Sequence, residues 1–135
     1  MRMIYQFPVL DFGAGAEIYY VMGPRNKKGK LIDYGVHHPT ETFTADTLPA
    51  YVSVGTAADA DAYGEELSMG LLAADAGSNS VLSQVEGDGL NVEDYILDAG
   101  YSLPVNTKVG LHCTSPTGGT PAGIAIPFMV IDWAD

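Results

Sequence analysis

The chain has 135 residues, which fits one domain, and 47% of them are hydrophobic, so it can bury a core. Its formal net charge of −11 argues against wrapping nucleic acid, which requires a basic surface, and weighs against binding an anionic membrane. The 16 Gly, eight Pro and eight Tyr favour a loop-rich β protein over a helical one. No signal peptide and no apolar run of membrane-spanning length is recognisable, so we expect an intracellular or virion setting.

The N-terminal residues 3–9 alternate as a β-strand does, and Pro8 places this strand at a sheet edge or in an extended arm. We therefore expect residues 1–15 to be either an edge strand or an arm that lies over a neighbouring subunit. Met3, Tyr5 and Phe7 are the candidate partner-binding residues of this segment. Residues 16–22 form the next predicted strand, which is apolar on both faces.

The stretch GPRNKKGK, residues 23–30, follows as a predicted loop that leads into a strand beginning at Leu31. It contains four of the six basic residues of the chain: Arg25, Lys27, Lys28 and Lys30. Two interpretations stay open. The loop is either a solvated tip of the kind common in soluble proteins or a docking point for an acidic partner.

His37 and His38 precede Pro39 in a predicted turn. Adjacent residues of an extended chain point in opposite directions, so we expect these two side chains to diverge and not to share a metal ion. Residues 50–55 form the next predicted strand.

The acidic segment from Asp59 to Glu66 is predicted to include a short helical turn, followed by a strand at residues 67–71. An oxygen-rich loop can hold calcium, but an EF-hand beginning at Asp59 would place Gly70 where its glutamate ligand belongs. Calcium binding at Asp59–Glu66 is left open. Further strands are predicted at residues 81–85 and 94–105.

Two strong strand patterns close the chain. Val109, Leu111 and Cys113 share one face of residues 108–114. Residues 122–133 are apolar on both faces, which predicts burial on two sides, under a second sheet or a partner subunit. The turn-forming residues SPTGGTPAG lie between the two strands, so we predict a hairpin.

Catalytic machinery is not recognisable in the sequence. His112 and the single cysteine, Cys113, are neighbours on a predicted strand, so their side chains diverge and cannot form a Cys–His pair. Cys113 falls on the apolar face and is expected in the core. No nucleophile motif or phosphate-binding loop occurs, so we expect neither an enzyme nor a cofactor or metal.

Eight to ten short strands predict an all-β sandwich, jelly-roll-like, with an extended N-terminal segment. The segment TLPAYVSVGTAADADAYGEEL and the run KVGLHCTSPTGGTPAGIAIPFMVIDW resemble capsid decoration, or cement, proteins of tailed bacteriophages. The resemblance spans roughly the last two-thirds of the chain. It implies a homotrimeric protein on the capsid surface, assembled in the host cytoplasm, which bridges subunits of the major capsid protein.

A lectin-like or adhesin module of a phage fibre or spike is the alternative. Such a module would use exposed aromatic side chains as a platform for sugars, although aromatic residues in strands are more often part of the core. The candidates are Tyr19, Tyr20, Tyr34, Tyr51, Tyr63 and Tyr101.

Overall fold

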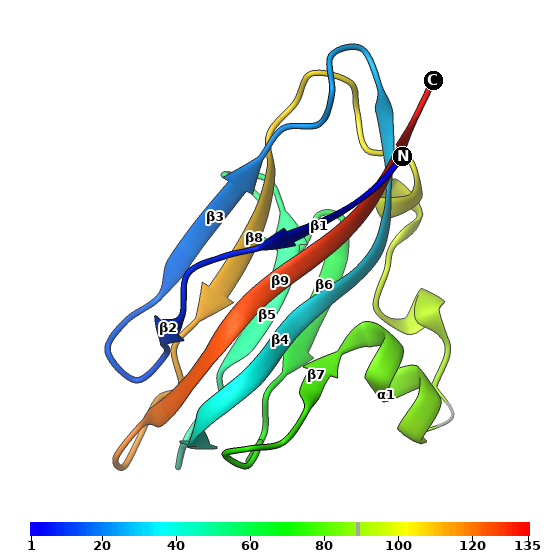
Figure 1. The fold of residues 1–135 in the computed structure, drawn as a ribbon. Coiled ribbons are helices and arrows are strands. Elements are labelled where there is room, and N and C mark those ends of the chain that lie inside the picture. Colours follow the sequence, from blue (N-terminus) through cyan, green and yellow to red (C-terminus); the bar gives the residue numbers. More distant parts are fainter. Residues whose placement is uncertain (89) are drawn as a thin grey trace.

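The computed structural model describes residues 1–88 and 90–135, and in them two antiparallel sheets pack face to face (Figure 1). The predicted β-sandwich is confirmed. The β9 sheet has five strands: β1 (Arg2–Gln6), β2 (Leu10–Asp11), β9 (Ala122–Ala134), β4 (Lys28–Thr44) and β7 (Ser78–Ser80). The β8 sheet has four: β3 (Glu17–Val21), β8 (Val109–Thr114), β5 (Tyr51–Gly55) and β6 (Gly64–Ser68).

The strands pair in a nested order around the turn between β5 and β6. β5 and β6 form the innermost pair along the chain. Moving outward in sequence from this pair, β4 pairs with β7, β3 pairs with β8, and β1 and β2 both pair with β9. The contacts of β9 with β4 and of β8 with β5 complete the two sheets. The first and last segments of the chain therefore lie side by side, and both termini emerge at the same end of the sandwich (Figure 1).

The predicted C-terminal hairpin is wrong, although both of its strands exist. β8 belongs to one sheet and β9 to the other, so the intervening residues 115–121 cross between the layers. Leu48 and Thr117 form an isolated bridge that anchors this crossing. A turn-rich link of this length can join strands within a sheet or span the roughly 10 Å between packed sheets, and the local pattern is the same in both cases.

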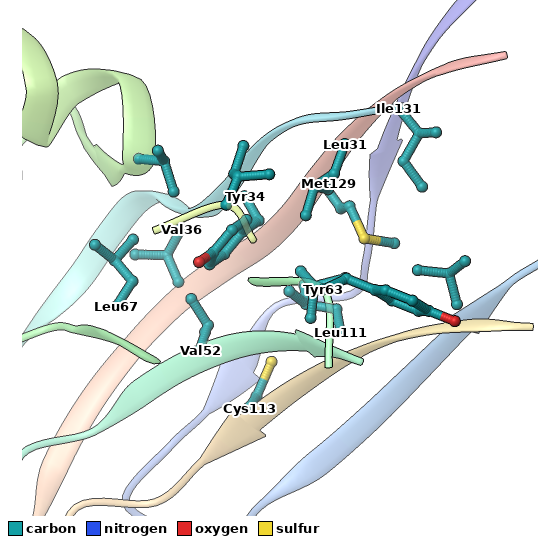
Figure 2. Close-up of a cluster of buried hydrophobic side chains, with 14 of the residues drawn as sticks. Leu31, Tyr34, Val36, Val52, Tyr63, Leu67, Leu111, Cys113, Met129 and Ile131 are labelled. Atoms are coloured by element: carbon teal, nitrogen blue, oxygen red, sulfur yellow. The ribbon is translucent and has the colours of Figure 1, made fainter. Parts of the chain in front are cut away.

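The core fills the space between the two sheets (Figure 2). Leu31, Tyr34, Val36, Met129 and Ile131 come from the β9 sheet and meet Val52, Leu67, Leu111 and Cys113 from the β8 sheet. Each fully buried side chain of this kind contributes about 1.5–3 kcal/mol. The Tyr34 hydroxyl donates to the Glu65 carbonyl oxygen at 2.5 Å, which satisfies the one polar group of this buried ring.

The N-terminal segment is part of the sandwich. Residues 2–6 pair in register with residues 128–132 of β9. Beyond β1, the Phe7 ring stacks on Tyr19 of β3, with ring centroids 4.7 Å apart, and so joins the edges of the two sheets. Of the two expectations for residues 1–15, the edge strand is confirmed and the arm is wrong within this chain.

A helix replaces the strand predicted at residues 81–85. α1 (Val81–Asp88) begins after Ser80, whose hydroxyl accepts from the Ser83 amide while the Ser83 hydroxyl accepts from the Ser80 amide. This reciprocal arrangement at a helix start resembles a capping box and favours the helix. The strand predicted at 94–105 is also wrong: two 3₁₀ turns, η1 (Val92–Asp94) and η2 (Asp98–Tyr101), occupy this stretch.

Candidate functional site

The outer face of β9 is apolar and only half-buried. Along the strand, burial alternates: Ala125, Met129, Ile131 and Trp133 are buried against the core, whereas the residues between them are partly exposed. Ile4 of β1 pairs with Val130, so its side chain shares this outer face, where it is 69% exposed. We call this surface the apolar outer face; it consists of Ile4, Ile124, Ile126, Phe128 and Val130.

No described segment crosses the apolar outer face in Figure 1, where β1, β9 and β4 lie in front of the β8 sheet. Within the chain, the second sheet buries only one side of β9, and burial of the other side under a partner subunit stays a prediction. The inner side packs against the β8 sheet, and the outer side is left half-exposed. Single exposed apolar residues are normal, but a continuous row of them along a central strand is typical of a surface that contacts another molecule.

The three partner-binding candidates of the N-terminal segment lie on the opposite side. Met3 and Tyr5 pair with Ile131 and Met129, whose side chains are buried, and Phe7 packs against the same core. Tyr5 also accepts a hydrogen bond at 2.9 Å from the indole nitrogen of Trp133. The side of β1 that a partner could reach carries Ile4 instead. The alternation of residues 3–9 in the sequence already places Ile4 on the side opposite to Met3, Tyr5 and Phe7.

The basic residues gather at one end of the sandwich. Lys28 and Lys30 are the first residues of β4 and not part of a loop, and they pair with Ala134 and Asp132. Arg2 pairs with the same Asp132 from the other side. The predicted loop 23–30 therefore ends at Lys27, and it connects strands of different sheets.

Lys108 joins this group from a distant part of the sequence. It precedes β8, whose Val109 pairs with Val21 just before the loop that holds Arg25. The Asn106 amide donates to Asn26 at 2.9 Å and ties the two loops together. All six Lys and Arg side chains of the chain thus lie at one end, which we call the basic end: Arg2, Arg25, Lys27, Lys28, Lys30 and Lys108.

Few of these cations are neutralised within the protein. Lys27 forms an ion pair with Asp135, and in the described part of the chain no other Lys or Arg has a carboxylate within 4.0 Å. Lys30 lies over the Tyr101 ring, 5.3 Å from its centroid. The opposite end of β9 is acidic, because Asp11 and Glu41 both pair with Ile124. The molecule therefore has charge of opposite sign at the two ends of its apolar outer face.

The two adjacent histidines do not diverge. Their rings lie 4.6 Å apart at 77°, and the Nδ1 atoms contact each other. His38 has a φ of +50°, in the left-handed region, because β4 bulges between His37 and Glu41. Desolvation, followed by the neighbouring His38, lowers the pKa of His37. The sequence argument failed here because it assumed a regular strand.

The acidic segment Asp59–Glu66 is divided between two places: its first residues, with Thr56, fold back over the outer face of the β8 sheet, and Gly64–Glu66 begin the edge strand β6 of that sheet. The Ser53 hydroxyl donates to the Ala60 carbonyl at 2.8 Å, and His112 Nε2 lies 2.9 Å from the Thr56 carbonyl. This cover explains why His112 is only 8% exposed although it points away from the core. The pKa of Asp61 is raised, chiefly by a side-chain hydrogen bond with Asp59.

The described titratable groups are spread over separate parts of the sandwich. Cys113 is buried on the inner face, and burial raises the pKa of its thiol to about 12, so it is not a ready nucleophile. Within the described residues, no group of three or more His, Cys, Asp or Glu side chains is placed to hold a metal ion. Among the same residues, no helix has the length and hydropathy needed to span a membrane.

The tyrosines do not form an exposed platform. Tyr34 and Tyr63 are buried, and Tyr19, Tyr51 and Tyr101 are partly buried. Only Tyr20, on the outer side of β3, is exposed to a large extent, at 41%.

Comparisons with protein-family models, with curated proteins and with solved structures found no match. The surfaces described above are therefore the basis for the proposed function.

Proposed function

We propose that this chain is a virion structural protein that binds the outer surface of a phage capsid and stabilises the shell by bridging subunits of the major capsid protein. The observation that carries the proposal is the apolar outer face, a row of half-exposed apolar side chains with all of the chain's positive charge at one end. Such a surface fits attachment to another protein better than it fits the binding of a small molecule.

The strand order supports the proposal. Joining β2 to β1 as one broken strand gives eight strands in two sheets, with the first strand paired to the last and the remaining pairs nested inside. We infer that this is the jelly-roll arrangement, which is found in viral capsid proteins and also in lectins. Because the same fold has several functions, the surface and not the topology has to distinguish the two classes.

The apolar outer face is the surface through which we expect copies of the chain to form a homotrimer. Its middle, from Ile126 to Val130, carries no charged side chain on the outer side of β9. A monomer with a net charge of −11 repels its own copies, so contact is most favourable where the charge is absent. The basic end then remains free to dock on acidic groups of the capsid.

The first test is a variant of the apolar outer face. Ile4→Asp places a charge at a side chain that is 69% exposed, so each chain should still fold, which circular dichroism can check. Light scattering at micromolar concentration is expected to show a trimer for the unmodified chain and a monomer for the variant. The matched control is Ile18→Asp, which places the same charge on a 41% exposed apolar side chain of the other sheet and leaves the apolar outer face unchanged.

The second test asks what the assembled protein does. Capsids that lack the protein are expected to rupture at a lower temperature than complete ones, and adding the purified chain should restore their resistance. Ile4→Asp should restore it less well because a monomer cannot bridge several sites. If depleted capsids are equally robust and adsorption to host cells fails instead, the adhesin alternative takes the place of this proposal. A chain that is monomeric both free and on capsids would contradict the trimer.

A further inference from the structure

His37 and His38 are brought together by an irregularity of β4. From His37 to Glu41 this strand advances four residues, while the paired residues of β9, Ile126 to Ile124, advance two. The two extra residues form a bulge, and the left-handed conformation of His38 turns its side chain out of the usual alternation. As a result, both imidazole rings lie on the same side of the strand.

The bulge is held in place by its neighbours. The His38 amide donates to the Gly77 carbonyl at 3.2 Å, and the Asp75 amide donates to the Pro39 carbonyl at 2.8 Å. On the other side, the His37 ring packs edge-on against Phe128, with centroids 5.6 Å apart. The backbone of the bulge and the His37 ring are therefore positioned by the fold before any ligand arrives, which lowers the entropic cost of binding one.

The two facing Nδ1 atoms of His37 and His38 require either a proton or a cation between them. Each neutral imidazole has one nitrogen that carries a proton and one with a free lone pair. Two Nδ1 atoms in contact are compatible with one shared proton or with a cation that both lone pairs bind. Zinc–imidazole bonds are about 2.0–2.1 Å long, so a small outward rotation of the rings admits a metal ion.

We propose that His37 and His38 form a binding site for a divalent transition metal ion of the kind that prefers imidazole, such as Cu²⁺, Ni²⁺ or Zn²⁺. The two Nδ1 atoms are the protein ligands, and water completes the coordination. The surface hollow of about 370 Å³ beside His38, lined also by Thr40 and Asp75, has room for these water molecules. Hard cations such as Mg²⁺ and Ca²⁺ prefer oxygen ligands and should not bind here.

The third histidine provides an internal control. His112 is 8% exposed, and its Nε2 is already engaged with the Thr56 carbonyl, so it should not bind a metal ion. Zn²⁺ is diamagnetic, so imidazole NMR signals can be followed while it is added to a chain prepared without an affinity tag. The ring signals of His37 and His38 are expected to shift together and saturate at one equivalent, while those of His112 stay unchanged.

Two variants distinguish a metal site formed by His37 and His38 from incidental metal binding elsewhere on the protein. His38→Asn keeps a residue that tolerates the left-handed conformation, and His37→Thr keeps a residue that suits a strand. Loss of an outer-shell partner already lowers metal affinity roughly 10–100-fold, so loss of one of two ligands should cost at least as much. Calorimetry with Cu²⁺ measures this loss, and circular dichroism confirms that each variant is folded.

Electron paramagnetic resonance of the Cu²⁺ complex gives a readout that does not depend on variants. The spectrum is expected to show hyperfine coupling to two imidazole nitrogens. Coupling to a single nitrogen, an affinity in either variant equal to that of the unmodified chain, or no binding at millimolar Zn²⁺ and Cu²⁺ would each overturn the proposal. In the last case, His37 and His38 form only a hydrogen-bonded pair.

Discussion

Asp33 lies where β4 meets the start of α1, and its carboxylate contributes to both elements. One of its oxygens accepts from the Tyr34 amide at 2.9 Å and from the Leu82 amide at 3.1 Å. The residue is only 7% exposed. Desolvation raises its pKa, and the hydrogen bonds from Leu82 and Tyr34 oppose this shift without cancelling it. The buried carboxylate of Asp33 thus ties β4 to the first turn of α1, at an electrostatic cost.

The raised pKa of Asp33 predicts the pH dependence of one substitution. Between its ordinary pKa of 3.8 and its raised value, the folded state binds the proton more tightly than the unfolded state. The contribution of Asp33 to the free energy of unfolding is therefore greatest below pH 3.8 and falls as the pH rises through the raised value. Asn at this position does not titrate, and its carbonyl can still accept both amide hydrogen bonds.

The substitution Asp33→Asn should accordingly become more favourable between pH 4 and pH 7, by about 1.4 kcal/mol for each unit by which the pKa is raised. Urea unfolding of both chains at the two pH values measures this difference. A variant whose relative stability is the same at both values, or is lower at pH 7, would show that the pKa is not raised.

β1 is the element whose role changes most between sequence and structure. Its inner side chains contact the core, Tyr5 receives the hydrogen bond of Trp133, and the Met1 amino group donates to the Trp133 carbonyl at 2.6 Å. Gly23 and Gly29 lie so close to the Trp133 ring that an added Cβ would come within 2.6 Å of it. The first and last strands are therefore locked together around this one tryptophan.

Removal of residues 1–10 is expected to unfold the protein. The deletion takes away the side chains of Met3, Tyr5, Phe7 and Leu10, which pack against the core, and exposes one edge of β9. Full burial of one such side chain contributes about 1.5–3 kcal/mol. The sum for four partly buried ones is a large part of the roughly 5–15 kcal/mol that keeps a domain folded.

Thermal unfolding followed by circular dichroism is the measurement for this deletion. The control is the pair Ile4→Thr and Gln6→Thr, which changes the outer side of β1 and leaves its pairing and inner contacts intact. The control should melt close to the unmodified chain. A truncated chain that melts within a few degrees of the full one would restore the interpretation of residues 1–15 as an arm.

The molecule as a whole is electrically polar along its strands. Six basic side chains from three separate parts of the sequence meet at one end, and Asp11 and Glu41 lie at the other. An acidic surface on a partner would attract one end and repel the other, so the charge distribution orients the encounter as well as accelerating it.

Replacing Arg25, Lys27, Lys28 and Lys30 with Ser is expected to weaken association with capsids and to flatten its dependence on salt. Folding should change little, because exposed charged pairs each contribute only about 0.2–1 kcal/mol. Co-sedimentation with capsids at several salt concentrations measures both effects. The control neutralises the other end with Asp11→Asn and Glu41→Gln, and it should bind at least as well as the unmodified chain. If the basic-end variant binds capsids as well as the unmodified chain does, these four residues are a solvated tip and not a docking point.

The candidate surfaces were only partly predictable. Residues 23–30 stood out in the sequence, but Arg2 and Lys108 joined them through the pairing of β1 with β9 and of β3 with β8. The alternation of β9 identified the apolar outer face, and nothing local showed which side would remain uncovered. The His37–His38 pair was missed because a bulge depends on the strand opposite, which lies far away in the sequence.

The sequence by itself determined the all-β class, the positions of β3, β5, β8 and β9, and which side chains of each strand share a face. It did so because side-chain alternation is a local property with a period of two residues. The tertiary structure decided which strands pair, that β8 and β9 lie in different sheets, and that residues 81–88 form a helix. These outcomes depend on contacts between distant segments, and a loop of given length costs nearly the same entropy whether it closes a hairpin or crosses to the other sheet.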